Sequence, residues 1–439
     1  METMDEQVHA SGANVRTRFA PSPTGLMHIG GVRTALYAYL VAKKNNGTFT
    51  LRIEDTDRSR YMEGAVPDII GTLKWLGLDF DEGPIYQSER KDIYAKYARE
   101  LVDKGFAYEQ DGAIWFKTEK EGKTSITDLV GQRVIEFDNG TQNDFVILKS
   151  DSFPTYHLAH VVDDHEMQTN PVIRGAEWIS SIPKHVMLFK AFGWEVPQYA
   201  HLPIILGSDK SKLSKRHGAK AASDFQKDGF LPEAILNYMA LLGWTSPSEK
   251  EILSVEEMIR NFDLKDVNLS NPVFDITKLE WMNGEYIRQM SDEELTKRMQ
   301  EFLVDHPAKE KIAELVPLVK ERIKKLSDFV PLTDFIFENP EYRIEEFNKV
   351  KVENQKEVLE KIAQTLENLP KPWDSASFEQ SFRKLAEDSG IKAGDMFQLI
   401  RLAVSGQTVT PPLFESIKII GEEETLDRIK QLASKYPNI

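Results

Sequence analysis

The sequence predicts an α/β fold that is followed by a helical C-terminal half. Near the N-terminus, a short apolar stretch leads into a turn rich in proline and glycine, and apolar residues then recur at helical spacing. Further short strand-like stretches alternate with amphipathic helices as far as Leu206. Beyond Ala219 the periodicity is mostly helical. Alternating strands and helices of this kind are typical of a parallel, Rossmann-like sheet.

The spacing of apolar residues places the individual elements. Strands are expected over 15–20, 48–53, 113–116, 132–137, 145–148, 171–173 and 200–206, and an amphipathic helix is expected over 66–76. Another helix begins near Pro232, because proline is tolerated at the first helical position. Charged amphipathic helices fill 294–369, and the segment PKPW at 370–373 breaks that series.

The first strand–turn–helix unit predicts a phosphate-binding site. The helix begins near the pair Gly30 and Gly31. The free backbone amides and the dipole of a helix N-terminus favour a bound anion, and glycine lets a phosphate approach the main chain. His28 adds a side-chain donor at the mouth of this site. Taken alone, however, a glycine pair before a helix is equally compatible with an ordinary turn.

Two motifs in the right order resemble those of one enzyme family. The segments PSPTG at 21–25 and HIGG at 28–31 are similar to the first signature of class I aminoacyl-tRNA synthetases, specifically the glutamyl-tRNA synthetases of the bacterial type. The segment KLSKR at 212–216 resembles their mobile KMSKS-type loop. The resemblance covers nearly the whole chain. It implies a class I Rossmann-like catalytic domain split by a connective insert, a helical stem-contact region and an all-α anticodon-binding region.

The resemblance divides the chain into consecutive parts. We expect a disordered leader (1–14), the first half of the catalytic domain (15–84), an insert that holds the tRNA acceptor end (85–152), the second half of the catalytic domain (153–206), the KMSKS-type loop with the stem-contact region (207–298), and two helical anticodon-binding subdomains (299–369 and 370–439). A helical end fits the bacterial-type glutamyl enzymes. Eukaryotic-type glutaminyl-tRNA synthetases end instead in β-barrels.

Composition restricts the class of protein further. The chain carries a net charge of −15, 28% charged residues and no long uncharged apolar run, so we expect a cytoplasmic protein without a membrane span. The negative charge argues against a general nucleic-acid coat, but a basic face can still bind tRNA. Without cysteine there is no disulfide and no thiolate zinc site. Some relatives hold zinc in the insert, but here the insert contains neither Cys nor His, so we expect no structural zinc.

The glutamate-binding residues are implied by the resemblance and match the charges of the substrate. Glutamate has two carboxylates and one ammonium group. An arginine fork suits a carboxylate, and Glu54 follows a strand at the position where the family binds the α-ammonium group. The expected glutamate-binding set is Arg18, Ala20, Ser22, Glu54, Tyr156, His160 and Arg174. Which arginine binds the side-chain carboxylate is left open by the sequence.

His160 departs from the family pattern, because many relatives have Asn or a small apolar residue there. Two interpretations follow. In one, a neutral imidazole packs against the strand and touches substrate only indirectly. In the other, His160 lines the glutamate pocket and binds the carboxylate best when protonated, since histidine titrates in the physiological range.

ATP is expected next to the helix N-terminus and beneath the lysine loop. The expected ATP-binding set is Ala20, Ser22, His28, Gly30, Glu177, Trp178, Ile205, Lys215 and Arg216, and the expected catalytic residues are His28, Lys212 and Lys215. A basic run is usually a solvated turn. Here it follows a core strand, so its lysines can close over the phosphates and stabilise the charge that develops as pyrophosphate leaves.

The implied function is that of a glutamate–tRNA ligase. ATP with Mg²⁺ activates L-glutamate, productively only when tRNA is bound, and the glutamyl group then passes to the 3′ end of tRNA(Glu). Whether tRNA(Gln) is also charged is left open. We expect a monomer. The alternatives are a paralogue that glutamylates a modified tRNA base, a catalytically silent tRNA-binding subunit, and a small-molecule nucleotidyltransferase with the same fold.

Overall fold

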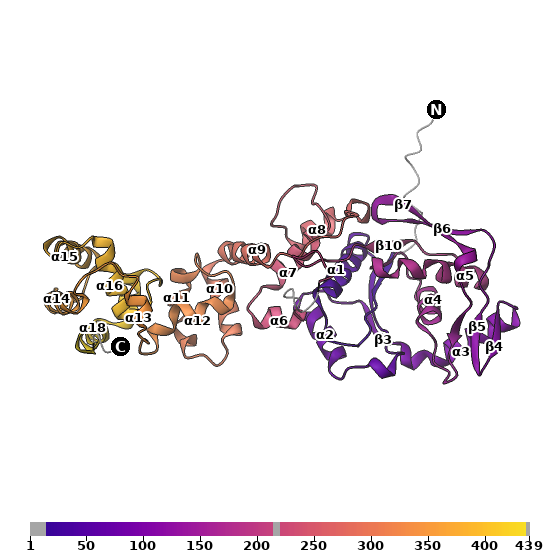
Figure 1. Ribbon diagram of the computed structural model, residues 1–439, viewed down its shortest axis with the longest axis horizontal. Coiled ribbons are helices and arrows are strands. Elements are labelled where there is room, and N and C mark those ends of the chain that lie inside the picture. Colours follow the sequence, from indigo (N-terminus) through magenta and orange to yellow (C-terminus); the bar gives the residue numbers. More distant parts are fainter. Residues whose placement is uncertain (1–14, 214–219, 436–439) are drawn as a thin grey trace, which may run out of the picture. The chain divides into compact units, whose positions relative to one another are not determined.

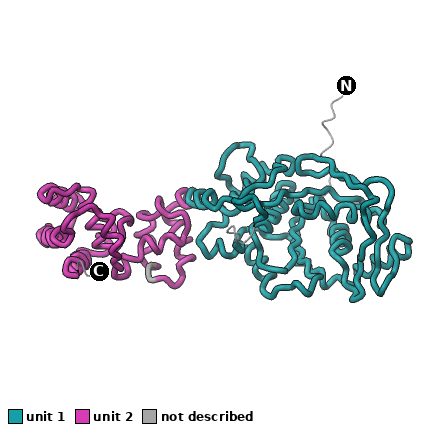
Figure 2. The backbone as a smooth tube through the Cα atoms, viewed as in Figure 1, with its two compact units in different colours: residues 1–286 teal, residues 287–439 magenta. Residues whose placement is uncertain are grey.

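The computed structural model describes residues 15–213 and 220–435, so the expected leader and the end of the lysine loop lie outside the described residues. The chain forms two compact units, 1–286 and 287–439 (Figure 2). The first unit combines strands and helices, whereas every regular element described in the second unit is helical (Figure 1). Among the described residues, no helix has the length and apolarity needed to cross a membrane.

The N-terminal part forms a three-stranded parallel sheet. Its elements are β1 (Arg16–Phe19), α1 (Ile29–Lys44), β2 (Thr48–Ile53), α2 (Ala65–Trp75) and β3 (Glu82–Tyr86), with sheet order β1-β2-β3. The strands predicted over 15–20 and 48–53 and the helix predicted over 66–76 are confirmed. Val32, Leu36 and Tyr37 of α1 are completely buried against this sheet and its neighbours. The buried packing of α1 therefore fixes the C-terminal end of the loop that precedes it.

The predicted insert contains two different pieces of sheet. Its elements are α3 (Lys91–Asp103), β4 (Ala107–Gln110), β5 (Ala113–Phe116), β6 (Lys123–Asp128), β7 (Arg133–Asp138) and β8 (Phe145–Leu148). Strands β4, β5 and β8 form one antiparallel sheet. The β6–β7 hairpin instead pairs with β10 (Tyr199–Leu202), with Asp128 aligned with Tyr199. Residues 85–152 therefore contribute one sheet of their own and a hairpin that extends the sheet of the second catalytic half.

The second catalytic half supplies α4 (Tyr156–Glu166), β9 (Val172–Gly175), α5 (Ile182–Phe192) and β10. The sheet order is β7-β6-β10-β9, and Arg174 of β9 is aligned with His201 of β10. Strand β10 is shorter than the predicted strand over 200–206. Pro203 follows its last residue, and proline has no amide hydrogen to donate to a neighbouring strand.

Residues after the lysine loop share the core of the catalytic domain. The elements are α6 (Ala222–Lys227), α7 (Pro232–Leu241), α8 (Val255–Asn261) and α9 (Ile276–Gln289). From α1, Arg33 donates to the carbonyl oxygen of Leu242 at 3.0 Å, and the hydroxyl of Tyr37 donates to that of Ala240 at 3.0 Å. These bonds attach the predicted stem-contact region to the helix that begins at the HIGG motif.

The second unit is built from short helices. They are α10 (Asp292–Phe302), α11 (Ile312–Val319), α12 (Phe329–Thr333), α13 (Ile344–Phe347), α14 (Gln355–Glu367), α15 (Ser375–Asp388), α16 (Ala393–Ser405), α17 (Leu413–Ile420) and α18 (Glu422–Lys435). One hydrophobic cluster extends from Phe347 to Ala433. The boundary proposed between residues 369 and 370 falls inside this cluster, so it separates two helices rather than two cores.

Candidate active site

A cavity of about 620 Å³ lies where β1, β2 and β9 end and α1 begins. Most of the side chains expected from the sequence border it. These residues are Arg18, Ala20, Ser22, His28, Gly30, Glu54, Tyr156, Arg174, Glu177, Trp178, Ile205 and Lys212. Of the remaining expected residues, Lys215 and Arg216 lie outside the described residues. His160 is described but does not line the cavity.

His28 is the N-cap of α1 and points a donor toward solvent. Its Nδ1 accepts a hydrogen bond from the backbone amide of Gly31 at 3.3 Å, so the ring proton is on Nε2. Partial enclosure of the ring and the nearby Lys212 ammonium group lower the pKa of His28, although Glu177 opposes them. A Cβ atom on Gly30 would lie 3.0 Å from Cε1 of His28. A larger residue at position 30 would therefore displace the ring by a few tenths of an ångström.

Arg18 is anchored by a carboxylate that lies far away in the sequence. Its Nε donates to Oδ1 of Asp164 at 3.0 Å, and its Nη2 lies 3.4 Å from Oδ2 of the same residue. Nη1 donates to the carbonyl oxygen of Ile173 at 3.0 Å. Guanidinium has five N–H donors, so these bonds leave one N–H on each terminal nitrogen. Arg18 can therefore still offer two hydrogen bonds to a ligand in the cavity.

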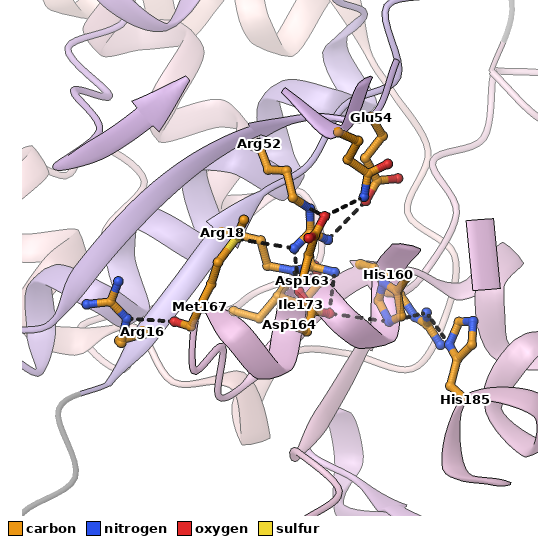
Figure 3. A network of polar contacts seen from close by, with 12 residues as sticks. Arg16, Arg18, Arg52, Glu54, His160, Asp163, Asp164, Met167, Ile173 and His185 are labelled. Atoms are coloured by element: carbon orange, nitrogen blue, oxygen red, sulfur yellow. Dashed lines mark hydrogen bonds and ion pairs between the residues drawn. The ribbon is translucent and has the colours of Figure 1, made fainter. Parts of the chain in front are cut away.

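Arg52 is a buried cation that joins three carboxylates (Figure 3). Its Nη1 donates to Asp164 at 2.7 Å, its Nη2 donates to Glu54 at 3.0 Å, and its Nε lies 3.8 Å from Asp163. Because a buried charge is costly unless paired, this arginine and its acidic partners stabilise one another. Sequence reasoning missed Arg52 and the two aspartates. A sequence pattern that points to Arg52 is a charged residue inside the mostly apolar strand β2.

Asp163 connects the same cluster to the start of the insert. Its carboxylate accepts hydrogen bonds from Gln87 at 2.8 Å, Arg90 at 2.9 Å and Tyr94 at 2.8 Å. Burial raises the pKa of Glu54 at the other end of the cluster, although Arg52 and Arg18 oppose this shift. The charge of Glu54 is therefore set by buried partners before any substrate arrives.

Arg174 is held by partners on several sides. Its Nε donates to Nε2 of His201 at 3.1 Å, and its Nη1 lies 3.1 Å from Nδ1 of His185 and 3.3 Å from the hydroxyl of Tyr156. Nη2 donates to the carbonyl oxygen of Trp178 at 3.3 Å. With these donors engaged, Arg174 keeps one N–H on Nη2 that has no partner among the described residues. The two-bond fork expected from the sequence is therefore only partly available here.

The position of His160 corrects the prediction that it lines the glutamate pocket. The ring is completely buried, and its Nε2 lies 3.3 Å from Oδ2 of Asp164 and 3.3 Å from Nη1 of Arg174 (Figure 3). Burial and the surrounding arginines lower the pKa of His160 well below its ordinary value. A neutral ring that lies behind the cavity and contacts the lining residues Arg174 and Tyr156 explains this geometry.

Glu177, Trp178 and Lys212 also line the cavity. The ring of Trp178 lies 4.3 Å from that of Tyr156, centroid to centroid. A Cβ atom on Gly175 would meet the Glu177 carboxylate at 2.1 Å, so glycine allows this side chain to fold back. Lys212 pairs with Leu206 through a backbone bridge and borders the cavity beside His28. Together these three residues combine an aromatic surface, a carboxylate and a cation.

Comparison with known proteins decides the family. The model described as "tRNA synthetases class I (E and Q), catalytic domain" matches residues 14–113 and 109–281, and the model described as "Anticodon binding domain" matches residues 294–433. The chain is 42% identical to a glutamate–tRNA ligase of Dehalococcoides mccartyi, over 94% of this chain and 96% of the relative. The chain belongs to the glutamyl-tRNA synthetase family.

Two further similarities cover nearly the full length. A glutamate–tRNA ligase of Borreliella burgdorferi is 40% identical, over 97% of this chain and 99% of the relative. A crystal structure of a glutamate tRNA ligase from Elizabethkingia meningosepticum, in complex with its amino acid, superposes with a TM-score of 0.84 and 31% identity, covering 96% of this chain and 99% of that one. The predicted family and fold class are confirmed.

Membership in the family makes the protein a class I aminoacyl-tRNA synthetase, an ATP-dependent ligase whose substrates are glutamate and tRNA. The match to an anticodon-binding domain argues against the base-modifying paralogue and the small-molecule nucleotidyltransferase, which have no such region. Intact HIGG and KLSKR segments argue against a catalytically silent subunit. The roles of individual cavity residues are a separate question.

Proposed function

We propose that this chain joins L-glutamate to the 3′ end of tRNA(Glu), with ATP cleaved to AMP and pyrophosphate. One observation carries the proposal. A single cavity is bordered on one side by a helix N-terminus capped by His28, and on the other by Arg18, Glu54 and Arg174. The first side suits a phosphate, and the second suits an amino acid with an additional carboxylate.

The charged side of the cavity is the proposed glutamate site. Glu54 attracts the α-ammonium group, and Arg18 and Arg174 bind carboxylate oxygens together with the hydroxyl of Tyr156. Arg18 keeps two N–H groups for this purpose and Arg174 keeps one, as their existing bonds require. Ala20 and Ser22 border both substrates. In this proposal His160 contributes through its contacts with Arg174 and Tyr156.

The helix N-terminus is the proposed ATP site. The Nε2–H of His28 and the first amides of α1 donate to phosphate oxygens near Gly30. Glu177 and Trp178 border the ribose and the adenine, and Ile205 completes the apolar floor. Lys212, with Lys215 and Arg216 of the following segment, supplies positive charge to the phosphates.

The chemistry then needs no protein nucleophile. An oxygen of the glutamate α-carboxylate attacks the α-phosphorus of ATP, the bond to the bridging oxygen breaks, and pyrophosphate leaves. A hydroxyl of the terminal ribose of tRNA next attacks the carbonyl carbon of glutamyl-adenylate, and AMP leaves. Orientation of the two reactants and stabilisation of phosphate charge account for the acceleration. His28 and the lysines act on the leaving pyrophosphate in the first step.

Mg²⁺ enters this proposal as part of the nucleotide substrate. Within residues 15–213 and 220–435, no three His, Cys, Asp or Glu side chains are grouped so that they could hold a metal ion. Mg²⁺ is commonly bound by substrate phosphates with few protein ligands. We therefore assign no residue of the chain to the ion.

The tRNA is proposed to contact several parts of the chain. The insert holds the acceptor end, residues 207–298 contact the stem, and the helices of the second unit bind the anticodon. We propose tRNA(Glu) as the substrate and tRNA(Gln) as a second acceptor to be tested. We also propose that the protein acts as a monomer in the cytoplasm.

A charging assay tests the proposed function. The purified chain is supplied with ATP, Mg²⁺, glutamate and either tRNA(Glu) or tRNA(Gln), and ATP–pyrophosphate exchange is measured with and without tRNA. We expect charging of tRNA(Glu) and exchange that depends on tRNA. Replacing Arg18 with Ala should cost roughly 2–5 kcal/mol of glutamate binding, because a charge-assisted contact in a desolvated site is lost. Arg260→Ala, an exposed arginine on α8, is the control.

Two outcomes would contradict the proposal. Folded protein that neither charges tRNA(Glu) nor catalyses exchange would exclude the activity. Equal glutamate KM values for Arg18→Ala, Arg260→Ala and the unmodified chain would exclude the assigned site while leaving the activity intact. Mass measurement in solution tests the monomer.

A further inference from the structure

Arg174 is fixed by two side chains that come from distant parts of the chain. Strands β9 and β10 are parallel neighbours, and the Nε–H of Arg174 donates to Nε2 of His201 across them at 3.1 Å. The other ring nitrogen of His201, Nδ1, lies 2.5 Å from Oδ2 of Asp128 on β6. His201 and Asp128 are completely buried, and Arg174 is 4% exposed. Asp128, His201 and Arg174 therefore form a chain of hydrogen bonds that runs from β6, in the insert, to the cavity.

The groups on either side of His201 determine which of its ring nitrogens carries the proton. A carboxylate accepts hydrogen bonds, so the short contact with Asp128 places the proton of His201 on Nδ1. Nε2 then carries a lone pair and can accept from Arg174, which has only donors. Burial lowers the pKa of His201, against the opposing effect of the Asp128 hydrogen bond. The neutral ring is the form that the geometry requires, because a protonated Nε2 would face the Arg174 donor.

We infer that Asp128 and His201 are positioning residues that hold Arg174 in the orientation that binds glutamate. Neither residue lines the cavity, so both act through the arginine. The inference rests on the proposed role of Arg174 in glutamate binding. The guanidinium also lies over the ring of Tyr199, 5.0 Å from its centroid, so rotation about its long axis is restricted on that side as well. Pre-organisation of this kind reduces the cost of ordering the side chain when substrate binds.

Asp128 offers a substitution that changes one contact. Its Oδ1 accepts from the amides of Val130 at 2.9 Å and His201 at 3.2 Å, whereas its Oδ2 faces the ring of His201. In Asp128→Asn the side-chain oxygen can keep both amide bonds, and the new amide NH₂ group replaces Oδ2. The NH₂ group is a donor, so it favours the His201 tautomer with the proton on Nε2. That proton would oppose the Nε–H of Arg174.

The test compares glutamate and ATP dependence in tRNA-dependent exchange. We expect Asp128→Asn to raise the glutamate KM by about ten- to a hundredfold, the range of a lost hydrogen bond to a charged group, and to change the ATP KM less than about twofold. In an Arg174→Gln background, the same substitution should add less than a twofold effect, because no guanidinium is left to position. Selective ¹⁵N labelling of histidine should show His201 protonated on Nδ1 in the unmodified chain and on Nε2 in the variant.

Controls separate positioning from general damage. Asp81→Asn changes another hydrogen-bonded aspartate of the same unit, one that pairs with Lys43 and the amide of Phe49, and should leave both KM values unchanged. If Asp128→Asn does not fold, His201→Gln and His201→Leu replace it. Glutamine can still accept from Arg174 and should preserve glutamate affinity at least tenfold better than leucine, in line with the same hydrogen-bond range.

Three results would overturn the inference. One is a glutamate KM for Asp128→Asn equal to that of Asp81→Asn, and another is equal affinity in the two His201 variants. Either result, with Arg174→Gln still impaired, removes the positioning role and leaves the proposed glutamate site standing. If Arg174→Gln itself binds glutamate normally, the assigned role of Arg174 fails and the positioning role fails with it.

Discussion

In the proposed glutamate site, the charge of Glu54 should make glutamate binding depend on pH. Burial raises the pKa of this carboxyl group above its ordinary value, and only the ionised form attracts the α-ammonium group. As pH falls through the raised pKa, the protonated fraction grows, so the glutamate KM should rise while the ATP KM stays constant. The measurement is the apparent glutamate KM with tRNA present between about pH 5 and 8, where free glutamate side chains are already ionised.

Glu54→Gln provides the control for this prediction. The amide does not titrate, so the variant should have a high glutamate KM that does not rise further as pH falls. If the variant and the unmodified chain lose affinity in parallel as pH falls, another group is responsible.

His160 should affect packing rather than titration. Its ring is neutral because burial and nearby arginines lower its pKa well below the ordinary value. We therefore expect His160→Asn and the unmodified chain to show parallel pH profiles of glutamate KM between about pH 6 and 8, around the reference pKa of histidine. The variant should be less stable, since the buried ring also stacks on His185 with centroids 4.4 Å apart. If glutamate affinity changed with pH inside that window in the unmodified chain but not in His160→Asn, the interpretation in which protonated His160 binds the carboxylate would be correct.

The residues that the sequence revealed and those that it concealed differ in how they face the cavity. Glu54 follows β2, Arg174 lies near the end of β9 and His28 precedes α1, so motif and topology together indicate them. Arg52 and Asp164 lie behind that surface and contact ligand-facing residues only from the buried side. Partners of this kind are chosen by three-dimensional packing, which no single stretch of sequence specifies.

At the scale of elements, the start of α1 depends on the small size of residue 30. Replacing Gly30 with Ala would bring a Cβ atom within 3.0 Å of Cε1 and 3.1 Å of Nδ1 of His28. The ring must then move, which weakens its bond to the Gly31 amide and turns Nε2–H away from the proposed phosphate site. We expect the single-turnover rate of glutamate activation to fall by about a hundredfold, as for the loss of one preorganised donor.

Gly31→Ala is the matched control for this prediction. The nearest atoms to a Cβ there, on Met27 and Phe19, are 3.6 Å away, an ordinary contact. The Gly31 substitution should therefore cost much less than the Gly30 substitution. Equal losses in the two variants would mean that the glycine pair serves the approach of the nucleotide to the backbone rather than the placement of His28.

Local elements could be predicted more fully than their pairing. The β1 and β2 strands and α2 follow from the spacing of apolar residues, and the structure places them within about two residues of the expected limits, the usual error of such boundaries. The pairing of β6 with β10 could not be predicted, because it joins Asp128 to Tyr199 across a long stretch of chain. The hydrogen bonds that connect Asp128, His201 and Arg174 could not be predicted for the same reason.

At the scale of the whole molecule, the two units should unfold separately. Leu359 of α14 is completely buried in the hydrophobic cluster of the second unit. Leu359→Ala should destabilise that unit by roughly 2–5 kcal/mol, because a buried leucine is truncated. Calorimetry should show one transition moved to lower temperature and the transition of residues 1–286 unchanged, with an unaltered ATP KM. A uniform shift of all unfolding signals would show that the units unfold as one.

The β6–β7 hairpin also limits how this enzyme can be recombined with its relatives. A tempting chimera would exchange residues 85–152 as a cassette in order to alter contacts with the tRNA acceptor end. That exchange would also replace the strand that covers one edge of β10, leaving its backbone groups to find a new partner. It would import a foreign residue at position 128, next to His201. In the proposed assignment, this one segment carries both the contacts with the acceptor end and the aspartate that positions Arg174, so exchanging it would alter both.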